Sequence, residues 1–194
     1  MSVFSPELAH RETTVPLASF IKPFHAHYFS RTVGTPFRKR KYAFAGLPGL
    51  MPLVRAFLDT SAAERSPDYR YLFTLLGSEL ANNALTHSLS SEHGGTYTLT
   101  VDRDATGMTL TCQDQGTRRP MNPGPLTATH LDTLRPTAGS ANGQGLGLGL
   151  VSTLADQWGD NGNPKFRQVW FHLSYDLTDT PWNDINTDMD KADR

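Results

Sequence analysis

Gly143-Gln-Gly145-Leu-Gly147-Leu-Gly149-Leu150 places a glycine at every second position, and the residues after it predict a helix over about 149–158. Glycine lets the backbone turn tightly and approach a ligand closely. The first turn of a helix offers unpaired N–H groups and a positive dipole end to an anion. The stretch therefore predicts a phosphate cradle, although a flexible loop before a helix would have the same composition.

Two common phosphate-binding motifs are missing from the chain. A P-loop needs a glycine followed by lysine, and the sequence has no Gly-Lys pair. A dinucleotide-binding fingerprint starting at Gly143 would need glycine at position 148, where the chain has Leu148. The predicted cradle is therefore of another kind.

A second informative stretch is a helical pattern over about 69–89. Its apolar residues recur at helical spacing and predict a core-facing stripe, formed by Leu72, Leu75, Leu76, Leu80 and Ala84. Glu79, Asn83 and His87 follow one another at intervals of four, so they share one face of that helix. Polar groups on an apolar stripe cost free energy unless they are paired. The pattern predicts either a satisfied buried network or a ligand or metal site, and His87 by itself fits a structural role.

A third stretch, residues 107–113, alternates apolar and polar side chains and predicts a strand. Met108, Leu110 and Cys112 lie on one face, so Asp114 falls on the same apolar face at the end of the strand. An inward carboxylate followed by a glycine turn suits hydrogen bonding to a buried polar ligand. The same pattern also occurs in Asx turns at strand ends.

In this order the three segments resemble the N, G1 and G2 boxes of the GHKL ATPase superfamily, which includes gyrase B, histidine kinases and the bacterial anti-sigma-factor serine kinases. The N box of the anti-sigma branch, E-x-x-x-N-A-x-x-H, is matched by Glu79, Asn83, Ala84 and His87. Asp114-Gln-Gly116 matches the D-x-G of the G1 box.

The glycine run matches the G2 box in full, with Gly143, Gly145, Leu146, Gly147 and Leu148. The flanking residues 154–159 and 169–173 resemble actinobacterial proteins similar to anti-sigma-factor kinases. The resemblance covers about residues 38–177. One position departs from the pattern, because Arg118 stands where many relatives carry a second glycine.

The resemblance implies a role for each residue at the base and phosphate ends of a nucleotide site. Asp114 would accept a hydrogen bond from the adenine amino group, and Gly116 would give room for the ring. His87 would belong to the same nucleotide-binding set. The G2-box residues would wrap the phosphates of ATP, and residues 117–142 would form a lid that orders on nucleotide binding.

The resemblance also implies the chemistry of the site. Asn83 would bind a magnesium ion that bridges the phosphates, since amide oxygen is a hard ligand. Glu79 would polarise the attacking group, which is either a partner's hydroxyl or a water.

Composition limits the protein class. A chain of 194 residues with a net charge of −1 suits one domain with a real core and predicts no nucleic-acid partner. The one cysteine, Cys112, excludes a disulfide framework and is expected in the core. No apolar run approaches a membrane span of about 18 residues and no signal-peptide pattern is present, so we expect a cytoplasmic protein without membrane association.

The expected fold is an α/β two-layer sandwich of the Bergerat type, a mixed sheet with helices on one face. Its strands are predicted at 41–45, 95–103, 107–113 and 167–175, and its helices at 47–63, 69–89, 126–134 and 149–158. Residues 1–37 are expected to be a partly structured, aromatic-rich extension that packs on the domain or on a second subunit. Residues 178–194 are expected to be an acidic, disordered tail.

The functional expectation that follows from the resemblance is an ATP-binding anti-sigma factor with serine/threonine kinase activity. Such a protein would phosphorylate a STAS-domain antagonist and hold a sigma factor inactive, as a homodimer. The alternative is a non-catalytic regulatory module that binds ATP and grips a protein partner in a nucleotide-dependent way. A histidine kinase is disfavoured, because His10, His25 and His27 lie in a segment broken by prolines that is too short for a dimerising helical hairpin.

Overall fold

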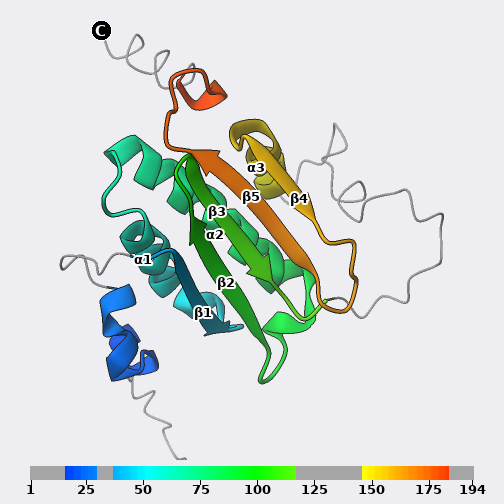
Figure 1. Cartoon of the computed structure of the whole chain (residues 1–194). Helices are drawn as coiled ribbons and strands as arrows, with labels where there is room; N and C mark the ends of the chain where they lie inside the picture. Colours follow the sequence, from blue (N-terminus) through cyan, green and yellow to red (C-terminus); the bar gives the residue numbers. More distant parts are fainter. Residues whose placement is uncertain (1–15, 30–36, 117–145, 184–194) are drawn as a thin grey trace, which may run out of the picture.

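A computed structural model describes residues 16–29, 37–116 and 146–183 (Figure 1). Five strands and three α-helices make up the described part, together with short 3-10 helices. In chain order they are η1 (Leu17–Phe20), η2 (Pro23–Tyr28), β1 (Lys39–Ala45), η3 (Pro48–Leu50), α1 (Met51–Ser61), α2 (Pro67–His87), η4 (Leu89–Ser91), β2 (Thr96–Arg103), β3 (Gly107–Gln113), α3 (Leu146–Leu154), β4 (Gln157–Asp160) and β5 (Gln168–Ser174).

The strands form one sheet in the order β1-β2-β3-β5-β4. All four pairings among the described strands are antiparallel, so the expectation of a mixed sheet was wrong. The reason is the path of the chain after β3. It passes through α3 into β4 at the sheet edge, and β5 then returns through the place beside β3. Because β5 separates β3 from β4, those two strands of equal direction never pair.

The expected α/β two-layer sandwich is confirmed, since α1, α2 and α3 all cover the same face of the sheet (Figure 1). The core lies between the layers, where alternate strand residues meet the helices. The strands contribute residues such as Leu99, Leu110, Cys112 and Phe171, and the helices contribute Phe57, Leu72, Leu76, Leu80 and Val151. Gly77 lets α2 pack closely, because a Cβ there would lie 2.8 Å from the methyl groups of Leu58.

The region after the glycine run differs from its prediction. The helix α3 ends at Leu154, and residues 157–160 form an edge strand instead of the last helical turn. Trp158 pairs with Phe171, and Gly159 lies against the ring of Trp170. Pairing with β5 satisfies the backbone of this segment, an interaction that no local pattern could reveal.

The described residues before β1 and after β5 pack against the domain. Tyr28 and Phe29 pack against the core, and the Thr60 hydroxyl donates to the Tyr28 carbonyl. At the other end Trp182 lies 5.6 Å from Tyr71, ring centre to ring centre. The first part of the expected tail, up to residue 183, therefore packs on the domain, because its apolar side chains find partners there. Residues 184–194 and the predicted helix at 126–134 lie outside the described residues.

Candidate nucleotide site

The helix α2 carries the N-box residues. Its start is set by Ser66, whose hydroxyl accepts the N–H of Tyr69 at 3.2 Å, and by Pro67 at the first helical position. Leu76, Leu80 and Ala84 point into the core, as the periodicity predicted. Glu79 and Asn83 lie at the border of this buried stripe and are partly exposed, and the C-terminal His87 is exposed. The three side chains thus lie on the edge of α2 and not in a buried network.

The polar atoms of Glu79 and Asn83 have no partner in the part of the chain that the structure describes. Within the described ranges no side-chain hydrogen bond or ion pair engages either residue. The described residues also contain no cluster of three or more acidic, histidine or cysteine side chains that could cage a metal ion. A magnesium ion held by one or two protein oxygens together with phosphates needs no such cage, so these donors fit a metal–nucleotide complex.

Asp114 lies where β3 and β5 meet, and its partner is Arg167. The antiparallel register pairs Cys112 with Val169 and Gln113 with Gln168, which brings position 114 opposite position 167. The Asp114 N–H donates to the Arg167 carbonyl at 2.9 Å. Oδ2 of Asp114 accepts from Arg167 Nε at 2.9 Å and from Nη2 at 2.7 Å. Both residues are buried, with 4% and 7% of their surface exposed.

The G1 turn after Asp114 is held from three sides. Oδ1 of Asp114 accepts the Gly116 N–H at 2.8 Å, the Gly116 carbonyl accepts the N–H of Leu89 at 2.7 Å, and Ser90 Oγ accepts the N–H of Gln115 at 3.1 Å. Gly116 has φ +72°, and a Cβ there would lie 2.0 Å from the Pro164 carbonyl oxygen. The lack of a side chain at Gly116 therefore makes room for the β4–β5 loop, whereas the resemblance implied room for the adenine ring.

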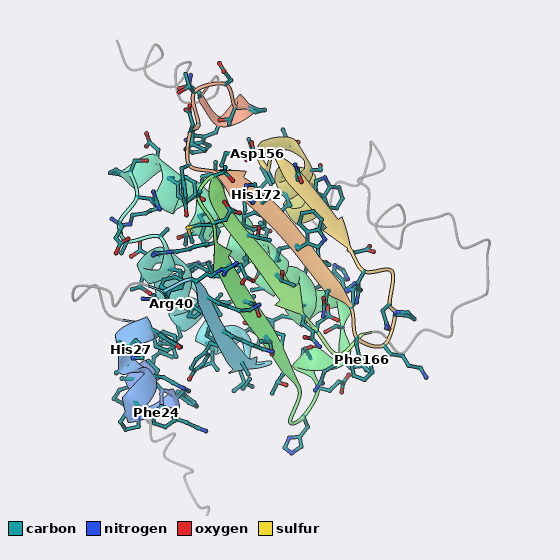
Figure 2. The ribbon with its side chains drawn as sticks, in the orientation of Figure 1. Phe24, His27, Arg40, Asp156, Phe166 and His172 are labelled. Atoms are coloured by element: carbon teal, nitrogen blue, oxygen red, sulfur yellow. The ribbon has the colours of Figure 1, made fainter. Side chains whose placement is uncertain are left out.

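His87 and Arg167 interact electrostatically at this end of the domain. Although His87 is exposed as a residue, partial burial of its ring and then the positive charge of Arg167 lower the pKa of His87 below its ordinary value. Phe166, next to Arg167, marks the same place in Figure 2, where β5 begins. The end of α2, the end of β3 and the start of β5 thus converge on one region.

The G2 box is only partly described. Residues 117–145 lie outside the described ranges, and with them Gly143, Gly145, Arg118 and the expected lid. Leu146 and Gly147 already belong to α3, which begins inside the box. The side chain of Leu148 is buried in the core. If Leu148 contributes to nucleotide binding, it does so through its backbone, because its side chain anchors α3 in the core.

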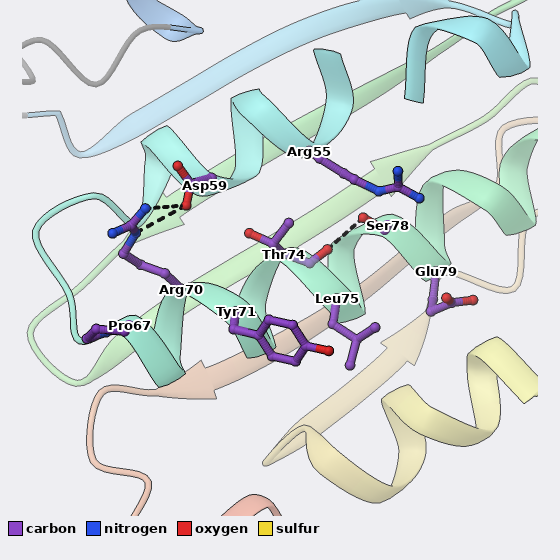
Figure 3. A pocket seen from close by; sticks show the side chains of 9 residues that line it. All are labelled: Arg55, Asp59, Pro67, Arg70, Tyr71, Thr74, Leu75, Ser78 and Glu79. Carbon is purple, nitrogen blue, oxygen red and sulfur yellow. Dashed lines mark hydrogen bonds and ion pairs between the residues drawn. The ribbon is translucent and has the colours of Figure 1, made fainter. Parts of the chain in front are cut away.

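A surface pocket of about 390 Å³ lies along α1 and α2 and ends at Glu79. At the other end of the pocket Arg70 forms an ion pair with Asp59, with 2.5 Å between Nη2 of Arg70 and Oδ1 of Asp59. Figure 3 shows this ion pair and Glu79 at opposite ends of the pocket. Tyr71 and Leu75 give the pocket an apolar wall. Asp114 is not among its lining residues, so the pocket is a neighbour of the nucleotide site and not the base pocket.

Arg167 was missed by the sequence analysis, although a signal for it exists. Val169, Phe171 and Leu173 alternate on the inward face of the predicted strand, and the same period places position 167 on that face. An arginine there needs a buried acid. Asp114 is the corresponding inward acid on β3, but only the strand register shows that the two residues meet.

The comparison with known families agrees with this geometry. The family profile described as the histidine kinase-like ATPase domain matches residues 44–171, more than half of the chain. The matched span includes the N box, the G1 turn and Arg167, and the observed sheet with its helices agrees with the Bergerat type of fold expected for this family. No curated protein matches the chain significantly. None of the helices in the described ranges is long and apolar enough to cross a bilayer.

Proposed function

Because the chain belongs to the histidine kinase-like ATPase domain family, an ATP-binding domain, we propose that it is an anti-sigma factor with serine/threonine kinase activity. Its substrate would be a STAS-domain antagonist, and its second partner a sigma factor. The observation that carries the proposal is the pair Glu79 and Asn83, one helical turn apart on the edge of α2, whose side chains have no hydrogen-bond or ion-pair partner among the described residues.

The two residues divide the chemistry between them. Asn83 would hold a magnesium ion, which when bound neutralises charge on the phosphates. Glu79 would orient the serine hydroxyl and take its proton as the oxygen attacks the γ-phosphorus and ADP leaves. Phosphoryl transfer depends mainly on positioning and charge neutralisation, so one carboxylate, one metal and a phosphate cradle are sufficient.

The partners would be chosen by surfaces around this site. The pocket along α1 and α2 ends at Glu79, so a partner seated there would bring its hydroxyl toward the carboxylate. We also propose that the protein acts as a homodimer, as the resemblance to the anti-sigma branch implies.

The alternative is a nucleotide-sensing module without transfer activity. It is favoured by the N-terminal segment, where Phe20 and Phe24 are 51% and 67% exposed (Figure 2 labels Phe24). Exposed aromatic side chains are typical anchors in protein–protein contacts. In this role ATP would change how the protein grips a partner, and Glu79 would serve only hydrolysis or retention of ATP.

A transfer assay separates the two functions. A STAS-domain protein recovered with the chain is incubated with radiolabelled ATP and either the wild type or Glu79→Gln. Glu64→Gln, an exposed carboxylate beyond the other end of α2, is the matched control. We expect Glu79→Gln to bind ATP and partner but to transfer phosphate roughly 10²-fold more slowly or worse, the usual cost of losing a general base. If the wild type binds both and transfers no more than Glu79→Gln, the kinase proposal is wrong and the sensing module remains.

A further inference from the structure

The carboxylate that the resemblance assigns to the adenine amino group is already engaged by the protein. Oδ2 of Asp114 receives both Nε and Nη2 of Arg167, at 2.9 and 2.7 Å. Oδ1 receives the Gly116 N–H at 2.8 Å. The base end of the site is therefore an ion pair and not a lone aspartate.

This pair is built to persist when a nucleotide binds. Asp114 and Arg167 are both more than nine-tenths buried, and their backbones are joined as well, by the bond from Asp114 N to Arg167 O. Separating a buried ion pair leaves an uncompensated charge, which is strongly destabilising. One hydrogen bond to a base yields less than that separation costs. A base should consequently bind beside the pair without displacing Arg167.

The number of lone pairs that remain free to accept a hydrogen bond determines which base the Asp114 carboxylate can recognise. A carboxylate offers about four lone-pair sites. Arg167 and Gly116 use three of them, and among the residues that the structure describes nothing occupies the remaining one, on Oδ1. A single acceptor site matches a single N–H donor, such as one hydrogen of a 6-amino group on a purine. A 6-oxo purine would place an acceptor against this oxygen and be rejected.

We propose that Arg167 is a positioning residue for base recognition, holding Asp114 so that Oδ1 alone faces the base. The inference rests on nucleotide binding in the proposed function, and does not depend on kinase activity. Without the two N–H donors of Arg167 the carboxylate would lose its fixed orientation, and with it the discrimination between amino and oxo groups. The affinity for the phosphates would not depend on Arg167.

Calorimetry on three ligands tests this role: ADP, inosine diphosphate and inorganic tripolyphosphate, each with magnesium. Arg167→Lys keeps the charge but not the paired donors, and Arg167→Met removes both. Lys165→Met, an exposed neighbour on the same loop, is the control. We expect both Arg167 variants to bind ADP about tenfold or more weakly, with the smaller loss for lysine, and to bind tripolyphosphate as the wild type does. The preference for ADP over inosine diphosphate should shrink by a similar factor.

Other results would overturn the proposal. If Arg167→Lys is folded by circular dichroism and keeps the wild-type preference for ADP over inosine diphosphate, Arg167 does not position the Asp114 carboxylate for base recognition. If either variant binds ADP more tightly than the wild type, Arg167 blocks the site instead. A purely structural role would weaken all three ligands equally. If Arg167 acts through Asp114, Arg167→Lys should also have no further effect on base preference in an Asp114→Ala background, where no side-chain oxygen is left to orient.

A wild type that binds none of the ligands would instead refute nucleotide binding itself. A wild type that binds ADP with the expected Arg167 dependence, yet transfers no phosphate, would leave this inference standing and remove only the kinase proposal.

Discussion

Asp114→Asn should change which base the site accepts, because Arg167 decides how the new amide is oriented. In the wild type Oδ2 accepts two N–H groups of Arg167, whereas Oδ1 accepts one N–H, from Gly116. In the variant the amide oxygen should occupy the position of Oδ2, since it keeps two hydrogen bonds there. The amide NH₂ then occupies the position of Oδ1, so the group that faces the base is a hydrogen-bond donor and no longer an acceptor.

The size of the effect follows from the bond that is lost. A hydrogen bond to a charged group contributes about 1.5–3 kcal/mol. Since about 1.4 kcal/mol is a factor of ten in affinity, ATP should bind roughly ten- to a hundredfold more weakly. Inosine triphosphate carries a carbonyl at the same position, so its affinity should fall less or rise. The variant should also unfold at a lower temperature, because Arg167 keeps its charge in a buried place without a counter-ion.

Isothermal calorimetry with ATP and with inosine triphosphate measures this change, at a temperature where the variant is folded. Asp102→Asn is the matched control, because this carboxylate is partly exposed and pairs with Lys39 away from the site. An unchanged affinity for ATP in folded Asp114→Asn would refute both the role of Asp114 and the orientation argument.

Three further predictions concern the metal, the G1 turn and the histidine. Asn83→Ala should abolish the magnesium dependence of ATP binding while adenosine still binds; wild-type binding that is unchanged by chelating all divalent ions would contradict the role of Asn83. Gly116→Ala should lower the free energy of unfolding, measured with denaturant, by more than the roughly 1–2 kcal/mol of a left-handed backbone alone, because its Cβ would lie 2.0 Å from a backbone oxygen. Gly94→Ala, with φ +75° and open space, isolates the backbone term, and equal losses would contradict the clash. His87 should titrate below its ordinary pKa of 6.5 by NMR. Since the unfolded chain then binds its proton at higher pH, stability should rise with pH through that interval, a slope that His87→Gln should remove; titration at or above 6.5 would exclude it.

Local sequence was sufficient for the parts of the site that are read along one element. The interval of four residues put Glu79, Asn83 and His87 on one edge of α2, and the alternation in β3 put Asp114 on the buried face. These patterns follow directly from the periods of the helix and the strand. The three boxes also indicated the GHKL superfamily, which the matching profile of the histidine kinase-like ATPase domain confirms, whereas the anti-sigma branch stays a prediction.

The pairing of strands that are distant in the sequence could not be predicted from local periodicity. The helix predicted over 149–158 overlaps the start of β4, and residues 157–160 form this strand because β5 satisfies their backbone. The same kind of long-range pairing makes the sheet antiparallel throughout its described strands, by placing β5 between β3 and β4.

The ion pair at the base end shows this division at the level of single atoms. From the sequence, Asp114 is predicted to be an inward carboxylate that binds a ligand, and no role is predicted for Arg167, 53 positions later. Only the register of β3 on β5 brings the guanidinium to Oδ2, while Oδ1 accepts the Gly116 N–H. The sequence determined which residues face the core, because that depends on local periodicity. The tertiary structure decided which of them meet, because a strand register is set by the packing of the whole sheet.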